Sequence, residues 1–234
     1  GTFEHGLDVM DIQSGRIIKH YGIGKGGLRS DFIFYIYETR SHDIYVLTSS
    51  GIHIYDSATD SFHVVDGFPE VLHYTCLTED HNGTLWAGTY WDGLYYYNPK
   101  THNRGIYRYE RGENTSLSSN VVNGIFEDSK KRLWITTENG LNLFNVKGKN
   151  FRRYTKADGL PANVTYCMLE DRRQNLWISS SSGLVKFNPE KKDIKIFTKS
   201  NGLLSDQFNY CSAFQDTDGT MYFGLSLIHI SEPT

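Results

Sequence analysis

One short pattern recurs along the chain and restricts it to a repeat architecture. The pattern appears as TLWAGTYWDGLYYYN (84–98), RLWITTENGLNLFN (132–145) and NLWISSSSGLVKFN (175–188). From Tyr45 onward its landmarks lie 41 to 48 residues apart, and the full set is Gly6, Tyr45, Trp86, Trp134, Trp177 and Tyr222. A repeat of this length is typical of solenoids, propellers and similar arrays.

The residues within one repeat predict four short strands. In 121–155 the segments VVNGIFED, RLWITT, LNLFN and NFRRYT are rich in β-branched and aromatic residues, and turn sequences separate them. The second and third segments are joined by ENG, a typical hairpin turn. No window has an apolar period of 3.6 over ten residues, which excludes helical repeats. The chain is therefore predicted to be all-β, a β-propeller fragment of four-stranded antiparallel blades, with four complete blades and two half blades.

The recurring tryptophan is predicted to pack between neighbouring blades. In RLWITT, Leu133 and Ile135 would lie on one face of the strand and Trp134 on the other. A single sheet cannot cover both of its apolar faces, but stacking the blades around an axis does so. We expect Tyr45 and Tyr222 to replace the tryptophan in their blades.

Blade geometry assigns the loops to two faces. If the strands are called A to D from the axis outward, the D-to-A and B-to-C loops share one face, the upper face. The A-to-B and C-to-D turns then share the lower face. The upper connections are longer and more varied, at 22–31, 66–71, 110–120, 155–163 and 198–207. Long loops on a rigid scaffold commonly carry binding residues, so a ligand is expected on the upper face.

The B-to-C loop TYWDG (89–93) differs from its counterparts TSSG, TENG and SSSG, which contain no aromatic residue. Tyr90, Trp91 and Asp92 offer a flat apolar surface and a carboxylate, which suits a sugar ring. Inner-strand residues could face the central opening and join the ligand site: His73, Thr75, Asn123, Tyr166 and Asn209. The structural alternatives are that Trp91 packs on a neighbouring loop and that the inner residues line a water-filled channel.

Motifs for catalysis, metals and cofactors are weak in this sequence. GIGKGG (22–27) has a phosphate-binding spacing, but it precedes a predicted strand and not the helix that a dinucleotide site needs. DTDG (216–219) begins like a calcium loop, but the same turn reads DHNG and DSKK in other repeats, which indicates an ordinary turn. The three cysteines have no metal-binding spacing. We expect no metal, no cofactor and no catalytic residue.

Charge and hydropathy argue against two further classes of partner. The net charge is −3 and the pI about 6.3, whereas nucleic-acid-binding domains usually have a basic excess. No run approaches the roughly 18 apolar residues that a membrane helix needs. Basic residues do gather in the predicted lower turns, at Lys130, Lys131, Arg132, Lys147, Lys149, Arg172, Arg173, Lys191 and Lys192. They indicate either a solvated face or a patch for an acidic sugar or a protein partner.

Two stretches carry a resemblance to a known family. The pattern ED-x-x-x-x-LW-I-x-T-x-x-GL-x-x-F-N-P resembles the two-component regulator propeller repeat. The stretch NGLLSDQFNYCSAFQDTDGTMYFG (201–224) is similar to the closing part of that family's second propeller. The resemblance covers about residues 3–224, and it supplies no ligand motif that can be transferred residue by residue.

The resemblance implies the periplasmic sensor region of a hybrid two-component system. Such a region would bind oligosaccharides released from a polysaccharide, form a homodimer with the rest of the sensor ectodomain, and signal to a histidine kinase inside the cell. This stretch contains no kinase, receiver or DNA-binding part, so we expect a non-enzymatic module that controls polysaccharide-utilisation genes through missing domains. The alternatives are a propeller lyase or hydrolase, and a protein-interaction scaffold without a small ligand.

The end of the chain departs from the repeat. Each earlier repeat has a glycine six or seven residues after its Trp or Tyr landmark, but the positions after Tyr222 are Ile228 and His229. The last ten residues, LSLIHISEPT (225–234), match the translation of a transposase-end sequencing adapter. We therefore expect a partial propeller over 1–224 and a non-natural tail over 225–234. We favour an open arc of blades; the alternative is a five-bladed ring closed by the two half blades.

Overall fold

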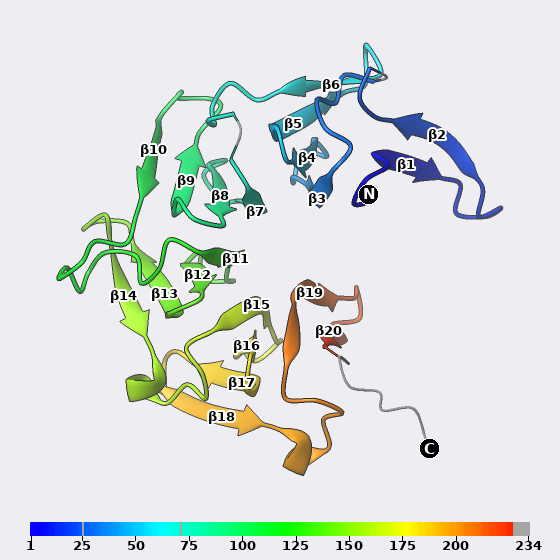
Figure 1. Ribbon diagram of the computed structural model, residues 1–234. Helices are drawn as coiled ribbons and strands as arrows, with labels where there is room; N and C mark the ends of the chain where they lie inside the picture. The colour runs from blue at the N-terminus through cyan, green and yellow to red at the C-terminus, as the bar shows by residue number, and fades with distance from the viewer. Residues whose placement is uncertain (25, 71, 227–234) are drawn as a thin grey trace. The chain divides into compact units, whose positions relative to one another are not determined.

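The computed structural model describes residues 1–24, 26–70 and 72–226, and the fold is almost entirely β-sheet (Figure 1). The chain divides into two compact units, Gly1–Tyr107 and Arg108–Thr234. The second unit also contains two short 3-10 helices, η1 (Lys156–Asp158) and η2 (Lys199–Asn201). Within the described ranges, no helix has both the length and the hydropathy that crossing a membrane requires.

Each unit is built from antiparallel sheets whose strands follow one another in sequence. In the first unit the sheets are β1 (Leu7–Met10) and β2 (Ile17–Tyr21); β3 (Ile33–Glu38), β4 (Ile44–Thr48), β5 (Gly51–Asp56) and β6 (Ser61–Val64); and β7 (Tyr74–Glu79), β8 (Leu85–Thr89), β9 (Leu94–Tyr97) and β10 (Arg104–Tyr107). In the second unit they are β11 (Val122–Glu127), β12 (Leu133–Thr137), β13 (Gly140–Asn145) and β14 (Asn150–Tyr154); β15 (Thr165–Glu170), β16 (Leu176–Ser180), β17 (Gly183–Asn188) and β18 (Asp193–Phe197); and β19 (Phe208–Gln215) and β20 (Met221–Leu225).

These sheets confirm the predicted blades. Four sheets have four strands each, and the two-stranded sheets β1–β2 and β19–β20 are the predicted half blades. The hairpin predicted at ENG is also present, because Thr137 pairs with Gly140 and leaves Glu138 and Asn139 as a two-residue loop. Gly140 has φ 112°, and a Cβ there would collide with the carbonyl oxygen of Tyr154, so the position requires glycine.

Two expectations about the ends of the fragment remain predictions. The open arc depends on how the two units are placed relative to each other. The expected non-natural tail covers 225–234: Leu225 is the last residue of β20, and the Ser226 amide donates to the Gln207 carbonyl at 2.9 Å. Residues 227–234 lie outside the described residues.

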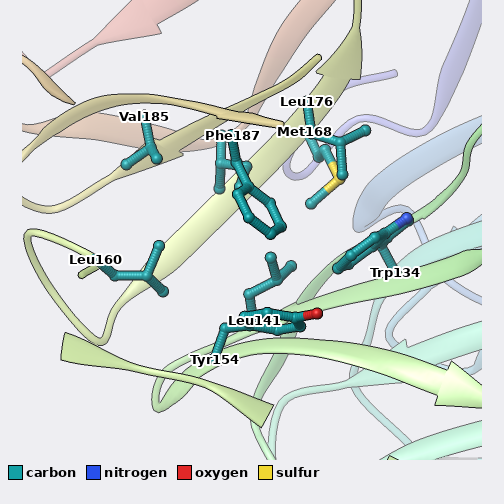
Figure 2. Packing of buried hydrophobic residues seen from close by; sticks show 9 residues of the cluster. Trp134, Leu141, Tyr154, Leu160, Met168, Leu176, Val185 and Phe187 are labelled. Carbon is teal, nitrogen blue, oxygen red and sulfur yellow. The ribbon is translucent and has the colours of Figure 1, made fainter. Parts of the chain in front are cut away.

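Trp134 lies in the core between two sheets of the second unit (Figure 2). Its side chain is fully buried, and it packs with Tyr154 of its own sheet against Met168 and Phe187 of sheet β15–β18. The rings of Trp134 and Phe187 meet edge to face, with centroids 6.0 Å apart. The predicted role of the recurring tryptophan is therefore confirmed in this blade.

The two tyrosines predicted to replace tryptophan differ from each other. Tyr45 is buried against Leu77 and Leu85 of the next sheet, as expected. Tyr222 is 54% exposed, and within residues 72–226 its ring stacks on Phe214 of its own sheet, with centroids 6.4 Å apart. No described strand follows β20, so the packing of Tyr222 between two blades stays a prediction.

Each recurring tryptophan is tied to the aspartate six residues before it. The indole N–H groups donate to carboxylates over 2.9, 2.8 and 3.0 Å in the pairs Trp86–Asp80, Trp134–Asp128 and Trp177–Asp171. The other carboxylate oxygen of each aspartate accepts two backbone N–H groups of the A-to-B turn. One buried or half-buried carboxylate thus fixes both the turn and the tryptophan, through charge-assisted hydrogen bonds.

The glutamate that precedes this aspartate joins adjacent blades. In the first unit, Glu79 accepts from the backbone N–H of Arg40 at 3.1 Å. In the second unit, Glu170 accepts from the N–H and the hydroxyl of Ser129 at 2.7 and 2.9 Å. Arg40 and Ser129 belong to the A-to-B turns of the preceding sheets. The Glu-Asp pair therefore holds two consecutive turns at the lower face of its unit.

A β-bulge interrupts the inner strand of each four-stranded sheet. The pairing leaves out Phe34 in β3, Thr75 in β7 and Asn123 in β11, and it leaves out Tyr166 and Cys167 in β15. Bulges bend a strand, redirect its side chains, and are common beside binding sites. The inner-strand candidates of the sequence analysis thus lie in irregular backbone, which simple alternation of side chains does not describe.

His53 is expected to make the stability of the first unit depend on pH. It is fully buried on β5, and burial lowers its pKa from the ordinary value of 6.5. The unfolded chain then binds the proton more readily than the folded chain. The contribution of neutral His53 to the free energy of unfolding is therefore full above about pH 6.5 and falls as the pH drops below this value. His53→Val introduces the residue that β17 has at the equivalent place, Val185. Its urea midpoint should change less than that of the wild type between about pH 7 and pH 5.

The control for this prediction is His5→Gln, which alters an exposed histidine of the same unit. Its midpoint should follow the wild-type pH dependence. If His53→Val kept the full wild-type slope, the buried imidazole would not be the origin of the pH dependence.

Candidate functional site

The upper face of the first unit carries a cluster of aromatic side chains, here called the aromatic shelf: Phe34, His73, Tyr90 and Trp91. Phe34 is the second residue of β3, His73 lies directly before β7, and Tyr90 and Trp91 lie in the loop between β8 and β9. Phe34 stacks on His73 with centroids 4.2 Å apart, and Tyr90 meets Trp91 edge to face at 4.6 Å. His73 joins the two pairs, since its ring lies 5.8 Å from Tyr90 and 6.2 Å from Trp91.

The shelf is open to solvent on one side. Trp91 is 70% exposed and Tyr90 41% exposed, and His73 is exposed as well. Exposed aromatic rings in contact with one another are uncommon on monomeric proteins and usually mark an interaction site. Trp91 also contacts His73 of the neighbouring D-to-A connection, so the packing alternative and the ligand-binding role both stay predictions.

The loop that carries Tyr90 and Trp91 is held at both ends. The Thr89 hydroxyl donates to the Gly93 carbonyl at 2.8 Å and accepts from the Asp92 N–H at 2.9 Å. The N–H of Tyr90 donates to the His73 carbonyl at 3.0 Å, which ties the loop to the inner strand. The additional residue of TYWDG is thus accommodated at the tip of the loop, where its two aromatic side chains are presented to solvent.

The shelf is an uncharged surface beside one carboxylate that already has a partner. His73 is exposed as a residue, but partial burial of its ring lowers the pKa of the imidazole, which is therefore neutral at neutral pH. The carboxylate of Asp92 accepts the hydroxyl of Tyr95 on β9. Flat neutral rings can pack against the apolar face of a ligand, and the amide, hydroxyl and imidazole groups beside them can orient it.

The other predicted residues lie in the second unit, and the first of them joins two sheets. Asn123 is 3% exposed, and its amide donates to the Thr165 carbonyl at 2.8 Å and to the Glu138 carboxylate at 3.1 Å. Both amide hydrogen bonds are therefore made within the protein. Asn123 is a link between inner strands of neighbouring blades and does not line a water-filled channel.

Tyr166 and Asn209 also make contacts within the second unit. Tyr166 is buried, and its ring lies edge to face with that of Tyr210 at 4.6 Å. The Tyr210 hydroxyl donates to Glu138 at 2.9 Å. Asn209 is exposed, and its amide donates to the Leu225 carbonyl at 3.2 Å. A ligand-binding role for Asn123, Tyr166 and Asn209 stays a prediction. The side-chain N–H groups of Asn123 already donate to Glu138 and Thr165.

The sequence analysis missed Phe34. It lies five residues before Thr39, as Thr75 lies five before Asp80 and Asn123 five before Asp128. Aligning the repeats on Thr39, Asp80 and Asp128 would have placed Phe34 at the position that Thr75 and Asn123 occupy in their own sheets. It was missed because an apolar residue on an inner strand indicates a core position in the absence of a bulge.

The basic residues of the lower turns are only partly available. Lys130 Nζ and Arg132 Nη1 both lie 2.8 Å from Glu190, and Arg132 Nε lies 2.6 Å from Asp128. Arg172 donates to the backbone carbonyl of Asp218. Four other cations line a shallow cavity of about 390 Å³ beside Asp193: Arg173, Lys186, Lys191 and Lys195. Binding of an acidic ligand there stays a prediction.

Groups for covalent or metal chemistry are sparse in the described part of the chain. No group of three or more His, Cys, Asp or Glu side chains is placed there to hold a metal ion. The three cysteines are free thiols. Burial raises the pKa of Cys167 to about 11, which keeps it protonated and unreactive at neutral pH.

Comparison with known proteins identifies the repeats. The two-component regulator propeller family matches residues 67–91, 116–139 and 159–182. Each match runs from an upper loop through strands A and B to the beginning of the B-to-C loop, and the first includes Tyr90 and Trp91. The chain carries two-component regulator propeller repeats. The resemblance inferred from the repeat pattern is thereby confirmed.

One curated relative is a histidine kinase. Histidine kinase P4 of Formosa agariphila is 33% identical over 97 residues, which is 38% of this chain and 7% of that protein. This chain therefore corresponds to a small part of that relative.

Solved structures with a similar fold include an extracellular domain of a two-component system, a secretion-system component and an enzyme. The extracellular domain of a protein assigned as a hybrid two-component system of B. thetaiotaomicron aligns with TM-score 0.77 and 19% identity, over 96% of this chain and 30% of that one. PorZ, a surface component of the type IX secretion system of Porphyromonas gingivalis, aligns with TM-score 0.73 and 15% identity, over 95% and 36%. Virginiamycin B lyase of Staphylococcus aureus aligns with TM-score 0.62 and 14% identity, over 82% and 63%. At these identities the likeness shows the propeller fold alone.

Proposed function

We propose that these regulator propeller repeats form part of the ligand-sensing ectodomain of a hybrid two-component system. The module binds oligosaccharides on its upper face, and the full-length protein passes the signal across the membrane to a histidine kinase that controls polysaccharide-utilisation genes. The ectodomain lies in the periplasm and forms a homodimer. The match to the regulator propeller family and the fold of the extracellular domain from B. thetaiotaomicron support this assignment.

The observation that carries the proposal is the aromatic shelf. Sugars present flat C–H faces that pack on aromatic rings, and Trp91 offers such a ring with 70% of its surface exposed. Tyr90 and His73 surround it with neutral polar groups suited to hydroxyls. Exposed rings that contact one another provide a surface on which a ligand can pack, so this geometry favours binding over catalysis.

Trp91→Ala should weaken oligosaccharide binding about tenfold, which corresponds to about 1.4 kcal/mol. The stacking surface is lost, while the loop is still held by the hydrogen bonds of Thr89 and Tyr90. Isothermal titration calorimetry with a panel of neutral and acidic oligosaccharides measures the change. Tyr222→Ala is the matched control, because it removes an exposed aromatic ring from β20.

Three outcomes separate the candidate functions. Equal affinities of Trp91→Ala and wild type for a sugar that binds would remove Trp91 from the site. Turnover of a glycan or lactone by the purified protein would favour the lyase or hydrolase alternative. Capture of a protein partner that Trp91→Ala abolishes, with no heat change for any sugar, would favour the scaffold alternative.

A further inference from the structure

A cavity lies on the sheet β7–β10, whose β8–β9 loop carries Tyr90 and Trp91 of the aromatic shelf, and it is lined by the outer strands β9 and β10. It has a volume of about 410 Å³ and is called here the rim pocket. Its lining includes Asp66, Phe68 and Pro69 of the D-to-A loop and Tyr95, Arg104 and Ile106 of the outer strands β9 and β10. This volume is within the usual range of small-ligand sites. The sheets β3–β6 and β7–β10, which flank the pocket, both have four strands.

The walls of the rim pocket are rigid and apolar. Tyr95 and Ile106 are directly paired across β9 and β10, so their side chains project on the same face of the sheet. Phe68 is buried, and its ring packs edge to face on Tyr74 at 6.0 Å and on Tyr97 at 5.9 Å. These contacts fix the positions of the walls before any ligand arrives, which reduces the entropy lost on binding.

The polar groups of the rim pocket carry opposite charges. Arg104 Nη1 makes one long hydrogen bond of 3.3 Å, to the backbone carbonyl of Asp66. The guanidinium has further N–H donors, and Asp66, which also lines the pocket, has a carboxylate that can accept hydrogen bonds. One cation and one anion leave the pocket without net charge. Donors and acceptors on apolar walls suit a neutral ring that bears hydroxyls, because each hydroxyl both donates and accepts.

One residue connects the rim pocket to the aromatic shelf. The ring of Tyr95 lines the pocket, and its hydroxyl donates to the carboxylate of Asp92. Asp92 follows Trp91 directly in the shelf loop. An oligosaccharide that reaches from Trp91 into the rim pocket would pass Asp92 and Tyr95.

We propose that the rim pocket is a second saccharide subsite, so that the site takes a neutral oligosaccharide extended across one blade and not a monosaccharide. This inference rests on the proposed function, in which Trp91 binds the first ring. Two subsites on one rigid blade act at high effective concentration, because binding of one ring holds the next beside its subsite. Affinity should therefore rise steeply with chain length.

The test is calorimetric titration of the whole chain with oligosaccharides of one to six units from cellulose, xylan, β-1,3-glucan and galactan. In the series that binds, the wild type should gain at least tenfold in affinity between one unit and the length that reaches both subsites. Arg104→Gln should lower the affinity for the oligosaccharide that reaches both subsites about tenfold, and it should leave the affinity for an oligosaccharide too short to reach the rim pocket unchanged. Trp91→Ala should weaken both. Arg16→Gln, which changes an exposed arginine of the same unit, should weaken neither.

The outcomes distinguish the two proposals. If Trp91→Ala weakens binding but Arg104→Gln leaves the dependence on chain length intact, the rim pocket is not a subsite and the proposed function stands. If monosaccharides bind as tightly as their oligomers, the extended site is also wrong. If no series binds at all, both the rim-pocket subsite and the proposed function are contradicted.

Discussion

Replacing Trp134 with alanine is expected to lower the free energy of unfolding by about 3–5 kcal/mol. The side chain is fully buried between sheets β11–β14 and β15–β18, where it contacts residues of both. Truncation removes this apolar contact and leaves a cavity, because the ring of Phe187 and the side chain of Met168 are held by their own sheet and cannot move in to fill the space.

Urea denaturation followed by circular dichroism measures this loss. The chain offers a matched control in Trp91→Ala, which makes the same substitution at a tryptophan that is 70% exposed. Its free energy of unfolding should stay within about 0.5 kcal/mol of the wild type. If both variants lost the same stability, Trp134 would not be the contact that holds the two blades together.

Replacing Asp128 with alanine should lower the free energy of unfolding by about 3 kcal/mol. Its carboxylate is buried and accepts four hydrogen bonds: from the backbone of Lys130 and Arg132 at 3.0 and 2.9 Å, from Arg132 Nε at 2.6 Å and from Trp134 Nε1 at 2.8 Å. The substitution leaves the indole N–H and part of the Arg132 guanidinium without their acceptor inside the protein. An unpaired buried donor costs more than the hydrogen bond itself contributes.

The aligned aspartate of the last half blade is the control for this variant. Asp216 is exposed, and among the described residues its carboxylate accepts hydrogen bonds from Thr217 of the same turn. Asp216→Ala should therefore cost no more than about 1 kcal/mol. Equal losses in Asp128→Ala and Asp216→Ala would mean that the turn matters and the link to tryptophan does not. A double-mutant cycle with Trp134→Phe isolates that link.

The blades could be predicted from the sequence because their signals are local and repeated. Each repeat carries its own hairpin turns and its own alternation of apolar residues, so four strands per repeat follow from one copy and are checked by the next. The role of Trp134 followed as well, because a strand with both faces apolar must be covered on both. The role of Tyr222 stays a prediction, because no described strand follows β20.

The candidate site could be predicted only in part. The atypical loop predicted Tyr90, Trp91 and Asp92, since two adjacent aromatic residues differ clearly from the three equivalent loops, which contain none. Phe34 was missed, and Asn123 was predicted to face the central opening, because both lie in bulges. A bulge adds one residue to a strand and redirects the side chains around it, and the sequence pattern does not reveal where this happens.

The basic turns show a second limit of reading the sequence alone. Nine lysines and arginines could be assigned to the lower turns, but not the partners they would find. Glu190, which follows strand β17, neutralises Lys130 and Arg132 from the preceding blade. Contacts of this kind join residues about sixty positions apart, and they depend on how two blades stack.

The indole N–H signals in a ¹H–¹⁵N NMR spectrum test the central claim most directly. The chain has four tryptophans, and the indoles of Trp86, Trp134 and Trp177 donate to aspartates in the protein. The fourth, Trp91, lies exposed on the aromatic shelf. Addition of an oligosaccharide that binds should shift the Trp91 indole signal and leave the other three in place. Saturating binding with an unmoved Trp91 signal would contradict the proposal that this shelf is the sensing site.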